Sequence, residues 1–250
     1  MKKKTYELLL ALAVIVCAVI GIRAHTGNFG GRFKGQSGEQ KYVNTQTFDT
    51  ASGIEADVTA MDVSIVQGDS FSCTYRCGRE SEIPEMKVEN GILKITQKNH
   101  ADGFFWLGGG PSSLEITVPE DMKTDRITVS GQAGDLYMEK VTAEKTSVSL
   151  DAGDFSADQC SLGDAECDFS AGDCALSECT VGSCRIDSSA GDVTMDLKGG
   201  RSDYSFDVST SAGDVEIDGD LYESEYQYQG GGSLIFADLS AGDISIGFSE

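Results

Sequence analysis

A row of aspartates at equal spacing is the feature of this sequence most able to do chemistry. Each ends an Ala-Gly-Asp tripeptide, and the first four copies follow one another at intervals of 19 residues. If consecutive copies stack at the spacing of neighbouring strands, about 4.8 Å, their carboxylates repel one another and calcium could bridge them with oxygen ligands. This candidate calcium ladder comprises Asp135, Asp154, Asp173 and Asp192.

The tripeptide also has a purely structural interpretation, which we prefer. Glycine enters positive φ without a Cβ clash, alanine fits a tight corner, and aspartate can accept hydrogen bonds from nearby backbone N–H groups. The Gly-Gly-x-Gly-x-Asp pattern of calcium-binding β-rolls is absent from the sequence. We therefore expect structural turns, with no metal and no cofactor, at Gly134, Gly153, Gly172, Gly191, Gly213 and Gly242.

Other residue types for catalysis are scarce. The chain has only two histidines, His25 and His100, so no histidine-based triad or multi-histidine metal site can form. The longest interval between motif copies, residues 214–242, holds acids and Tyr222, Tyr226 and Tyr228 but no Lys, Arg or His. We expect a protein that is not an enzyme, and this lack of bases disfavours the alternative of a polysaccharide-acting enzyme.

The cysteines favour packing over metal or redox chemistry. Several occupy positions where other repeats carry aliphatic residues, which is typical of small core hydrophobes. Cys73 and Cys77 lack the CxxC spacing of a metal or redox site. Cys160 and Cys179 would stack within disulfide range, and the sequence leaves open whether they are bonded.

The elements that would position these residues are short strands in a solenoid. A fixed period near 20 residues indicates a stacked array, and the apolar residues after each motif alternate as in strands with one buried face. A shift of 19 residues aligns apolar positions such as Val148, Cys167 and Ile186, which predicts a laddered interior.

Charge divides the chain into a basic leader and an acidic body. Of 19 basic and 41 acidic residues, 6 and 2 precede residue 41, which leaves the body 13 and 39, a formal charge of −26. Such a field disfavours nucleic acid and anionic lipid as partners of the body. The lysines at 2–4 and the apolar run at 8–22 predict an uncleaved single-pass signal-anchor with its N-terminus in the cytoplasm, although a cleaved signal peptide remains the alternative.

The expected organisation has five parts. A short basic cytoplasmic tail (1–5) precedes a transmembrane helix (6–22) and a glycine-rich tether (23–40). An irregular β-rich region of first coils or a cap (41–119) then leads into the regular solenoid (120–250). Within the irregular region, four residues could contact a partner or cover an open end of the solenoid: Phe104, Phe105, Trp106 and Leu107.

Several segments resemble the bacterial DUF4097 family of adhesin-like β-strand repeat proteins. They read GILKITQK at 91–98, LEITVP at 114–119, ITVS at 127–130, and Ser-Ala-Gly-Asp followed by an apolar residue at 189–193, 211–215 and 240–244. The resemblance covers about residues 41–250 and carries no catalytic residue. It implies an all-β fold outside a cell membrane, a single-stranded right-handed parallel β-helix of about 19 residues per coil, preceded here by the transmembrane helix.

The resulting functional hypothesis is a membrane-anchored, extracytoplasmic binding or scaffolding module in cell adhesion or envelope-stress sensing. The alternative is a regulatory accessory protein of a membrane sensor or two-component system. In either case the expected partners are the membrane, through the N-terminal helix, and a protein or glycan at the cell surface. The sequence names no ligand and leaves the oligomeric state open.

Overall fold

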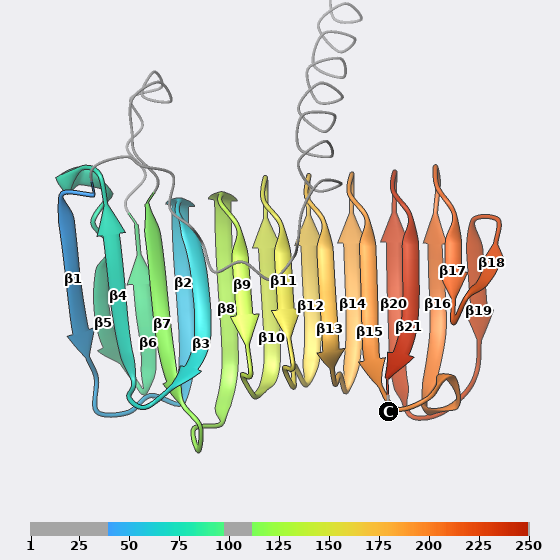
Figure 1. Ribbon diagram of the computed structural model, residues 1–250, viewed down its shortest axis with the longest axis horizontal. Helices are drawn as coiled ribbons and strands as arrows, with labels where there is room; N and C mark the ends of the chain where they lie inside the picture. Colours follow the sequence, from blue (N-terminus) through green and yellow to red (C-terminus); the bar gives the residue numbers. More distant parts are fainter. Residues whose placement is uncertain (1–39, 98–111, 250) are drawn as a thin grey trace, which may run out of the picture. The chain divides into compact units, whose positions relative to one another are not determined.

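Alternating apolar and polar residues give this chain short strands stacked in two sheets (Figure 1). The computed structural model describes residues 40–97 and 112–249. In these two ranges the regular elements are β-strands and two single-turn 3-10 helices, η1 (Glu80–Glu82) and η3 (Arg201–Asp203). The expected all-β class is confirmed. None of the helices in the same ranges has the length and hydrophobicity needed to cross a bilayer.

One sheet has 11 strands and the other has 10; we call them sheet A and sheet B. In spatial order, sheet A contains β1 (Tyr42–Thr47), β4 (Ser72–Cys77), β7 (Ser113–Pro119), β3 (Asp62–Gly68), β9 (Leu136–Glu139), β11 (Phe155–Asp158), β13 (Cys174–Cys179), β15 (Val193–Lys198), β21 (Ile244–Ser249), β17 (Val215–Ile217) and β18 (Asp220–Tyr222). Sheet B contains β19 (Glu225–Tyr228), β16 (Tyr204–Thr210), β20 (Ser233–Leu239), β14 (Ser183–Ser188), β12 (Asp164–Phe169), β10 (Ala143–Leu150), β8 (Thr124–Ala133), β2 (Gly53–Ala60), β6 (Ile92–Thr96) and β5 (Glu85–Glu89).

From β8 to β15 the chain alternates between the sheets, one strand in each per coil. Neighbouring coils pair in parallel, so that Val148 of β10 lies between Val129 of β8 and Cys167 of β12. The inward residues form columns of one chemical type across the coils, and all three of these side chains are buried. Each coil therefore covers the apolar face of its neighbours, since a single coil cannot bury that face alone.

The coils of the stacked array do not follow sequence order at the two ends. The last coil of the chain, β20 and β21, inserts between β14–β15 and β16–β17. At the other end, β2 and β3 lie between β6–β7 and β8–β9. The 29-residue interval between the last two motif copies is therefore a hairpin excursion followed by a return.

Antiparallel strands close both ends of the solenoid. At one end, β4 pairs antiparallel with both β1 and β7, and β5 pairs antiparallel with β6. At the other end, β18 pairs antiparallel with β17, and β19 pairs antiparallel with β16. The parallel geometry thus belongs to the central coils. The right-handed sense of the coiling stays a prediction.

Some expected features lie outside the described residues. These are the cytoplasmic tail (1–5), the transmembrane segment (6–22), the tether (23–40) except residue 40, and the aromatic segment Phe104 to Leu107.

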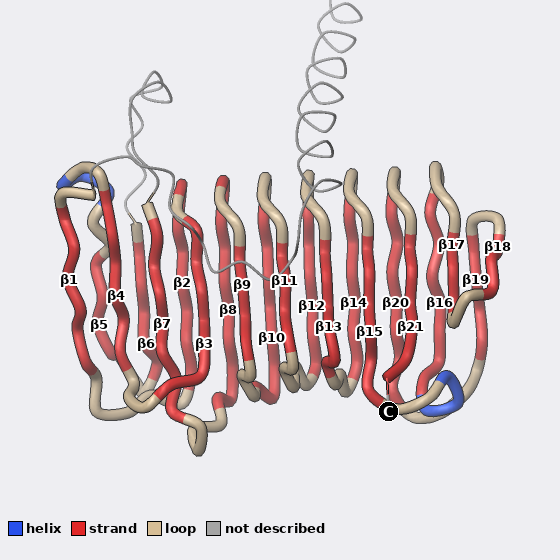
Figure 2. The backbone as a smooth tube through the Cα atoms, in the orientation of Figure 1, coloured by secondary structure: helices blue, strands red, loops and turns tan. Residues whose placement is uncertain are grey.

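The turns that join sheet B to sheet A lie in a row along one edge of the solenoid (Figure 2). Gly172 has φ +148°, in a region that L-residues rarely adopt, and a Cβ added there would overlap the carbonyl oxygen of Gly153 in the neighbouring coil. The glycine is therefore required twice, by its own backbone and by the close approach of the next turn. The other motif glycines share both properties: Gly134, Gly153, Gly191, Gly213 and Gly242.

We expect Gly172→Ala to lower the free energy of unfolding by at least about 1–2 kcal/mol, because the new Cβ adds strain and displaces the adjacent turn. Gly232→Ala is the matched control, since nothing lies within 4 Å of its Cβ position. Thermal melts of both variants test this, and equal melting temperatures would show that the stacked turn tolerates a side chain.

Candidate functional site

The six motif aspartates form one continuous row along the edge of the solenoid where the turns lie, which we call the Ala-Gly-Asp edge. They stand at the first position after each turn, directly before the strand in sheet A. Their spatial order differs from their sequence order, because the coil of Asp243 lies between those of Asp192 and Asp214.

Each carboxylate in the row before the last, Asp214, caps the neighbouring coil and not its own turn. The backbone N–H of Asp173 donates to Oδ1 of Asp154 at 2.9 Å, and the N–H of Asp154 donates to Oδ1 of Asp135 at 3.0 Å. The same bond recurs from Asp192 to Asp173, from Asp243 to Asp192 and from Asp214 to Asp243, at 2.8–2.9 Å. The expectation of an aspartate at a turn is met, but the hydrogen bond crosses between coils.

A seventh aspartate, Asp62, was missed by sequence reasoning and begins the row. Its Oδ1 accepts from the N–H of Asp135 at 3.2 Å. Met61 occupies the place of the motif glycine, so no tripeptide marks this coil. The available signal was the pattern after it, since Val63 and Ile65 alternate as the apolar residues do after each motif copy.

The row holds negative charge partly out of water. Burial raises the pKa of Asp154; the hydrogen bond from Asp173 N–H opposes this, and the charges of Asp135 and Asp173 add to the rise. Burial likewise raises the pKa of Asp62, with a further contribution from Asp135. Asp62 and Asp154 are thus the positions of the row at which the folded chain favours a proton.

The candidate calcium ladder is engaged by the backbone. One oxygen of Asp135, Asp154, Asp173 and Asp192 already accepts an N–H from the next coil. In residues 40–97 and 112–249, no three His, Cys, Asp or Glu side chains are grouped so that they could hold a metal ion.

The described cysteines are free and buried in the core. The backbone N–H of Val141 lies 3.5 Å from the sulfur of Cys160. Cys179 occupies the equivalent position to Cys160 in the neighbouring coil. A hydrogen bond with Cys179, and then burial, raises the pKa of Cys160, and burial raises that of Cys167 and Cys174. Thiols held protonated in an apolar interior are poor nucleophiles and act as packing residues.

The tyrosines of the 214–242 interval close one end of the solenoid. The guanidinium of Arg201 donates to the hydroxyl of Tyr222 at 2.8 Å, also donates to Tyr226, and pairs with Asp220 at 3.2 Å. Sequence reasoning overlooked Arg201 because it precedes the interval and reaches it only through the fold. The guanidinium of Arg201 is held by two tyrosines and an acid, so it is not free to act as a general base. These residues therefore close the end of the solenoid.

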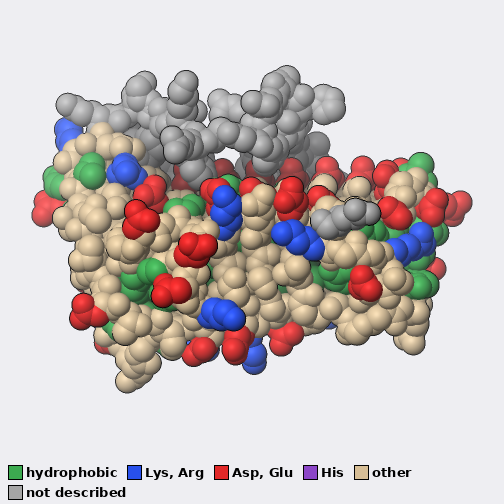
Figure 3. Space-filling view, turned by 60° about the horizontal axis from the view of Figure 1, so that its bottom comes forward, with side chains coloured by type: hydrophobic (Ala, Val, Ile, Leu, Met, Phe, Trp, Pro, Cys, Tyr) green, Lys and Arg blue, Asp and Glu red, His purple; other side chains and the backbone are tan. Residues whose placement is uncertain are grey.

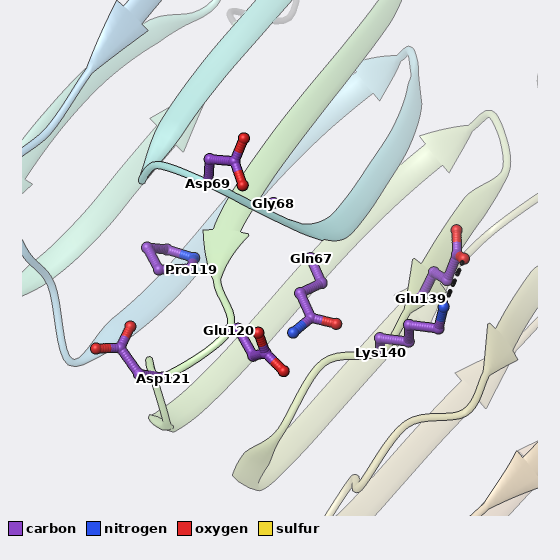
Figure 4. Close-up of a pocket in the computed structure, with 8 residues that line it drawn as sticks. All are labelled: Gln67, Gly68, Asp69, Pro119, Glu120, Asp121, Glu139 and Lys140. Atoms are coloured by element: carbon purple, nitrogen blue, oxygen red, sulfur yellow. Dashed lines mark ion pairs between the residues drawn. The ribbon is translucent and has the colours of Figure 1, made fainter.

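A hollow of about 670 Å³ lies at the opposite edge, where the strands of sheet A end (Figure 4). Its single basic group, Lys140, forms an ion pair with Glu139 at 3.9 Å. The remaining lining contains neither histidine nor cysteine, and its titratable side chains are the carboxylates of Asp69, Glu120, Asp121 and Glu139. The residues that line it are Gln67, Gly68, Asp69, Pro119, Glu120, Asp121, Glu139 and Lys140.

A second hollow, of about 290 Å³, lies on the outer face of sheet B beside the Ala-Gly-Asp edge; we call it the outer groove. Asp168, Asp187 and Asp238 lie in register on three adjacent strands, and Ser149 continues their row. Arg185 binds both oxygens of Asp187, at 2.8 and 3.1 Å. On the face seen in Figure 3, charged groups of both signs are scattered and do not gather in one patch.

The model of the Toastrack DUF4097 family matches residues 51–180 and 120–246. The two overlapping matches together span most of the chain. The chain belongs to the Toastrack DUF4097 family. The resemblance found in the sequence is confirmed, and no curated protein matches the chain.

Solved structures match the chain at low sequence identity. A candidate cell adhesion protein from Clostridium sporogenes is 16% identical, with 83% of this chain and 99% of that chain covered and a TM-score of 0.54. A candidate adhesin from Bacteroides fragilis is 11% identical, with 82% and 97% covered and a TM-score of 0.35. A candidate lipid binding protein from Parabacteroides distasonis is 12% identical, with 84% and 98% covered and a TM-score of 0.35. This DUF4097 member therefore shares a fold with the first, and at such identities function does not follow from fold.

Replacing Asp154 separates its hydrogen bond from its charge. We expect Asp154→Ala to cost about 1–3 kcal/mol, because it leaves the N–H of Asp173 without its acceptor. Asp154→Asn keeps an oxygen acceptor and removes the repulsion from Asp135 and Asp173, so it should melt at or above the wild-type temperature at pH 7.

The pH dependence gives the sign of the charge effect. Since the folded pKa of Asp154 lies above the ordinary 3.8, the folded chain binds the proton more tightly than the unfolded chain. The wild type should therefore gain stability from this group as pH falls toward 3.8, and any advantage of Asp154→Asn should shrink over that window. Melting curves from pH 7 to 3.5 measure this; an advantage that grows on acidification would contradict it.

Calcium tests whether the row of carboxylates is also a metal site. We expect millimolar calcium to shift the melting temperature no more than magnesium at equal ionic strength, because screening alone relieves the repulsion. A calcium-specific rise, abolished by Asp154→Asn together with Asp173→Asn, would turn the row into a site, since ligand binding stabilises the folded state.

Proposed function

We propose that this DUF4097 protein is a non-enzymatic binding or scaffolding module at the cell surface, in adhesion or envelope-stress sensing. The supporting observation is the outer groove, in which carboxylates and hydroxyls repeat from strand to strand along a rigid sheet. Repeated acceptors about 4.8 Å apart suit an extended partner that meets several coils at once. The described residues that line the two hollows include carboxylates and hydroxyls but no histidine or cysteine, and the one lysine is paired with Glu139, which supports a binding role over catalysis.

The partner we propose is a surface protein or glycan that presents cationic or hydroxyl groups. The body's formal charge of −26 opposes binding of nucleic acid and other polyanions. Within the outer groove, Asp168 and Asp238 lack the arginine that binds Asp187, so their oxygens can accept hydrogen bonds from a ligand.

We further propose that the segment at 6–22 anchors the chain as a single-pass helix, with the body outside the cytoplasm. The three lysines at 2–4 and the apolar run that follows support this orientation. In the regulatory alternative, a signal from the body would pass to the cytoplasm through another membrane protein. This is the sense in which the regulatory alternative remains.

The experiment compares cells that carry the full chain with cells that lack it, for adherence to a surface coated with cell-wall glycan and for induction of an envelope-stress reporter. We expect Asp168→Asn, Asp187→Asn and Asp238→Asn together to reduce adherence several-fold, because the groove loses its charged acceptors. The matched control is Asp158→Asn, Asp196→Asn and Glu216→Gln, which removes the same charge from the outer face of sheet A.

Protease added to intact, wall-stripped cells serves as the topology control and should digest the body in every strain that carries the chain. Unchanged adherence with an altered reporter in cells lacking the chain would favour the regulatory alternative. Unchanged adherence and an unchanged reporter would overturn the proposal, as would full protection of the body from protease.

A further inference from the structure

The two sheets end unevenly at the end of the solenoid that contains β1. Sheet A has one strand more than sheet B, and among the described strands β5 lies opposite β4 while none lies opposite β1 (Figure 1). Asn44 and Gln46 pair with Tyr75 and Cys73 of β4, so they lie on the inner face, yet both are exposed. Strand β1 is therefore a ledge that extends past the end of sheet B.

The edge of sheet B beside this ledge leaves part of the core uncovered. Val88 of β5 lies opposite Leu93 of β6 and so points to the inner face. Leu93 is fully buried, whereas Val88 is 41% exposed. The gap next to β5 and over the inner face of β1 has the dimensions of one missing strand, because strands lie about 4.8 Å apart and sheets about 10 Å apart.

Strand β1 also lacks the devices that usually prevent edge pairing. Its sequence, Tyr-Val-Asn-Thr-Gln-Thr, has no charge and no proline, and its register with β4 runs over six residue pairs without a bulge. The other described edges are guarded. Strand β5 alternates Glu85, Lys87 and Glu89, while β18 and β19 have only three and four residues.

We propose that a second copy of this chain fills the gap, so that the β1 strand of each copy continues sheet B of the other. Strands β1 and β5 run in the same direction. The central strands of the two sheets run in opposite directions, and β5 is antiparallel to its neighbour β6 in sheet B. In sheet A, β1 is antiparallel to β4, which is itself antiparallel to β7, so β1 keeps the direction of its sheet. A two-fold axis parallel to the strands preserves that direction and exchanges the sheets. It places each β1 beside the partner's β5 in a parallel pair, and brings the two ledges face to face.

The surfaces that meet suit self-association better than a foreign strand. Asn44 and Gln46 carry amides that both donate and accept, so symmetry-related copies can satisfy each other. The inner face of β1 contributes no charge, which matters because the two bodies are both strongly acidic. Covering Val88 with the partner's β1 removes apolar surface from water and joins two edges at once.

The test is the mass of the full chain in detergent micelles, by sedimentation equilibrium with the detergent matched for density. We expect a dimer at micromolar concentration that dissociates on dilution. Asn44→Lys with Gln46→Lys should give single chains with unchanged circular dichroism, because four lysines would meet in the closed interface. Val43→Lys with Thr47→Lys is the control; these residues lie on the outer face and should leave the dimer intact.

Hydrogen exchange supplies a second readout that needs no variant. Amides of β1 and β5 should exchange more slowly in the wild type as concentration rises, while those of β18 and β19 should not change. Single chains at all concentrations would overturn the proposal and leave the gap to a foreign strand. A dimer that survives the inner lysines, or is lost with the outer ones, would overturn it equally, since association would then use another surface.

Discussion

The close stacking of turns along the Ala-Gly-Asp edge is the constraint on which the rest of the structure depends. A Cβ at Gly172 would overlap the carbonyl oxygen of Gly153, so the coils that carry the motif reach strand spacing because each of their turns has a glycine there. That spacing lets the N–H of Asp173 reach the carboxylate of Asp154, and it brings inward residues such as Cys167 and Ile186 into contact across coils. The turn thus sets the period of the core.

The same stacking accumulates charge. Each carboxylate before the last, Asp214, accepts a backbone N–H of the adjacent coil, a hydrogen bond whose loss is unfavourable, while the partly solvated carboxylates repel one another. The raised pKa of Asp154 shows that the repulsion and burial persist in the folded chain. Backbone geometry therefore explains an aspartate in this position without a ligand. In the outer groove, by contrast, the polar side chains do not cap the turns of a neighbouring coil.

The local repeat could be predicted from the sequence, and the arrangement of the ends could not. Period and alternation identified the strands, the glycine turns and columns such as Val148 with Cys167, because those depend on neighbours 19 residues away. The insertion of β20–β21 between two earlier coils, the place of Asp62 and the reach of Arg201 depend on contacts between distant segments. In the outer groove, Asp238 lies beside Asp187 only because of that insertion, so the spacing in the sequence does not predict the complete row.

The two inserted coils explain why the ends of the solenoid differ. Because β20–β21 returns inward, the chain closes its far end with β18 in sheet A and β19 in sheet B, and Arg201 holds these two strands through Tyr222 and Tyr226. At the other end, β2 and β3 lie closer to the centre of the solenoid than β6 and β7, and β1 is a strand of sheet A without a described counterpart in sheet B. One end is thus sealed by side chains of the chain itself, while the other presents an uncharged strand edge. On a body whose like charges oppose contact almost everywhere else, that edge is where pairing meets least electrostatic resistance.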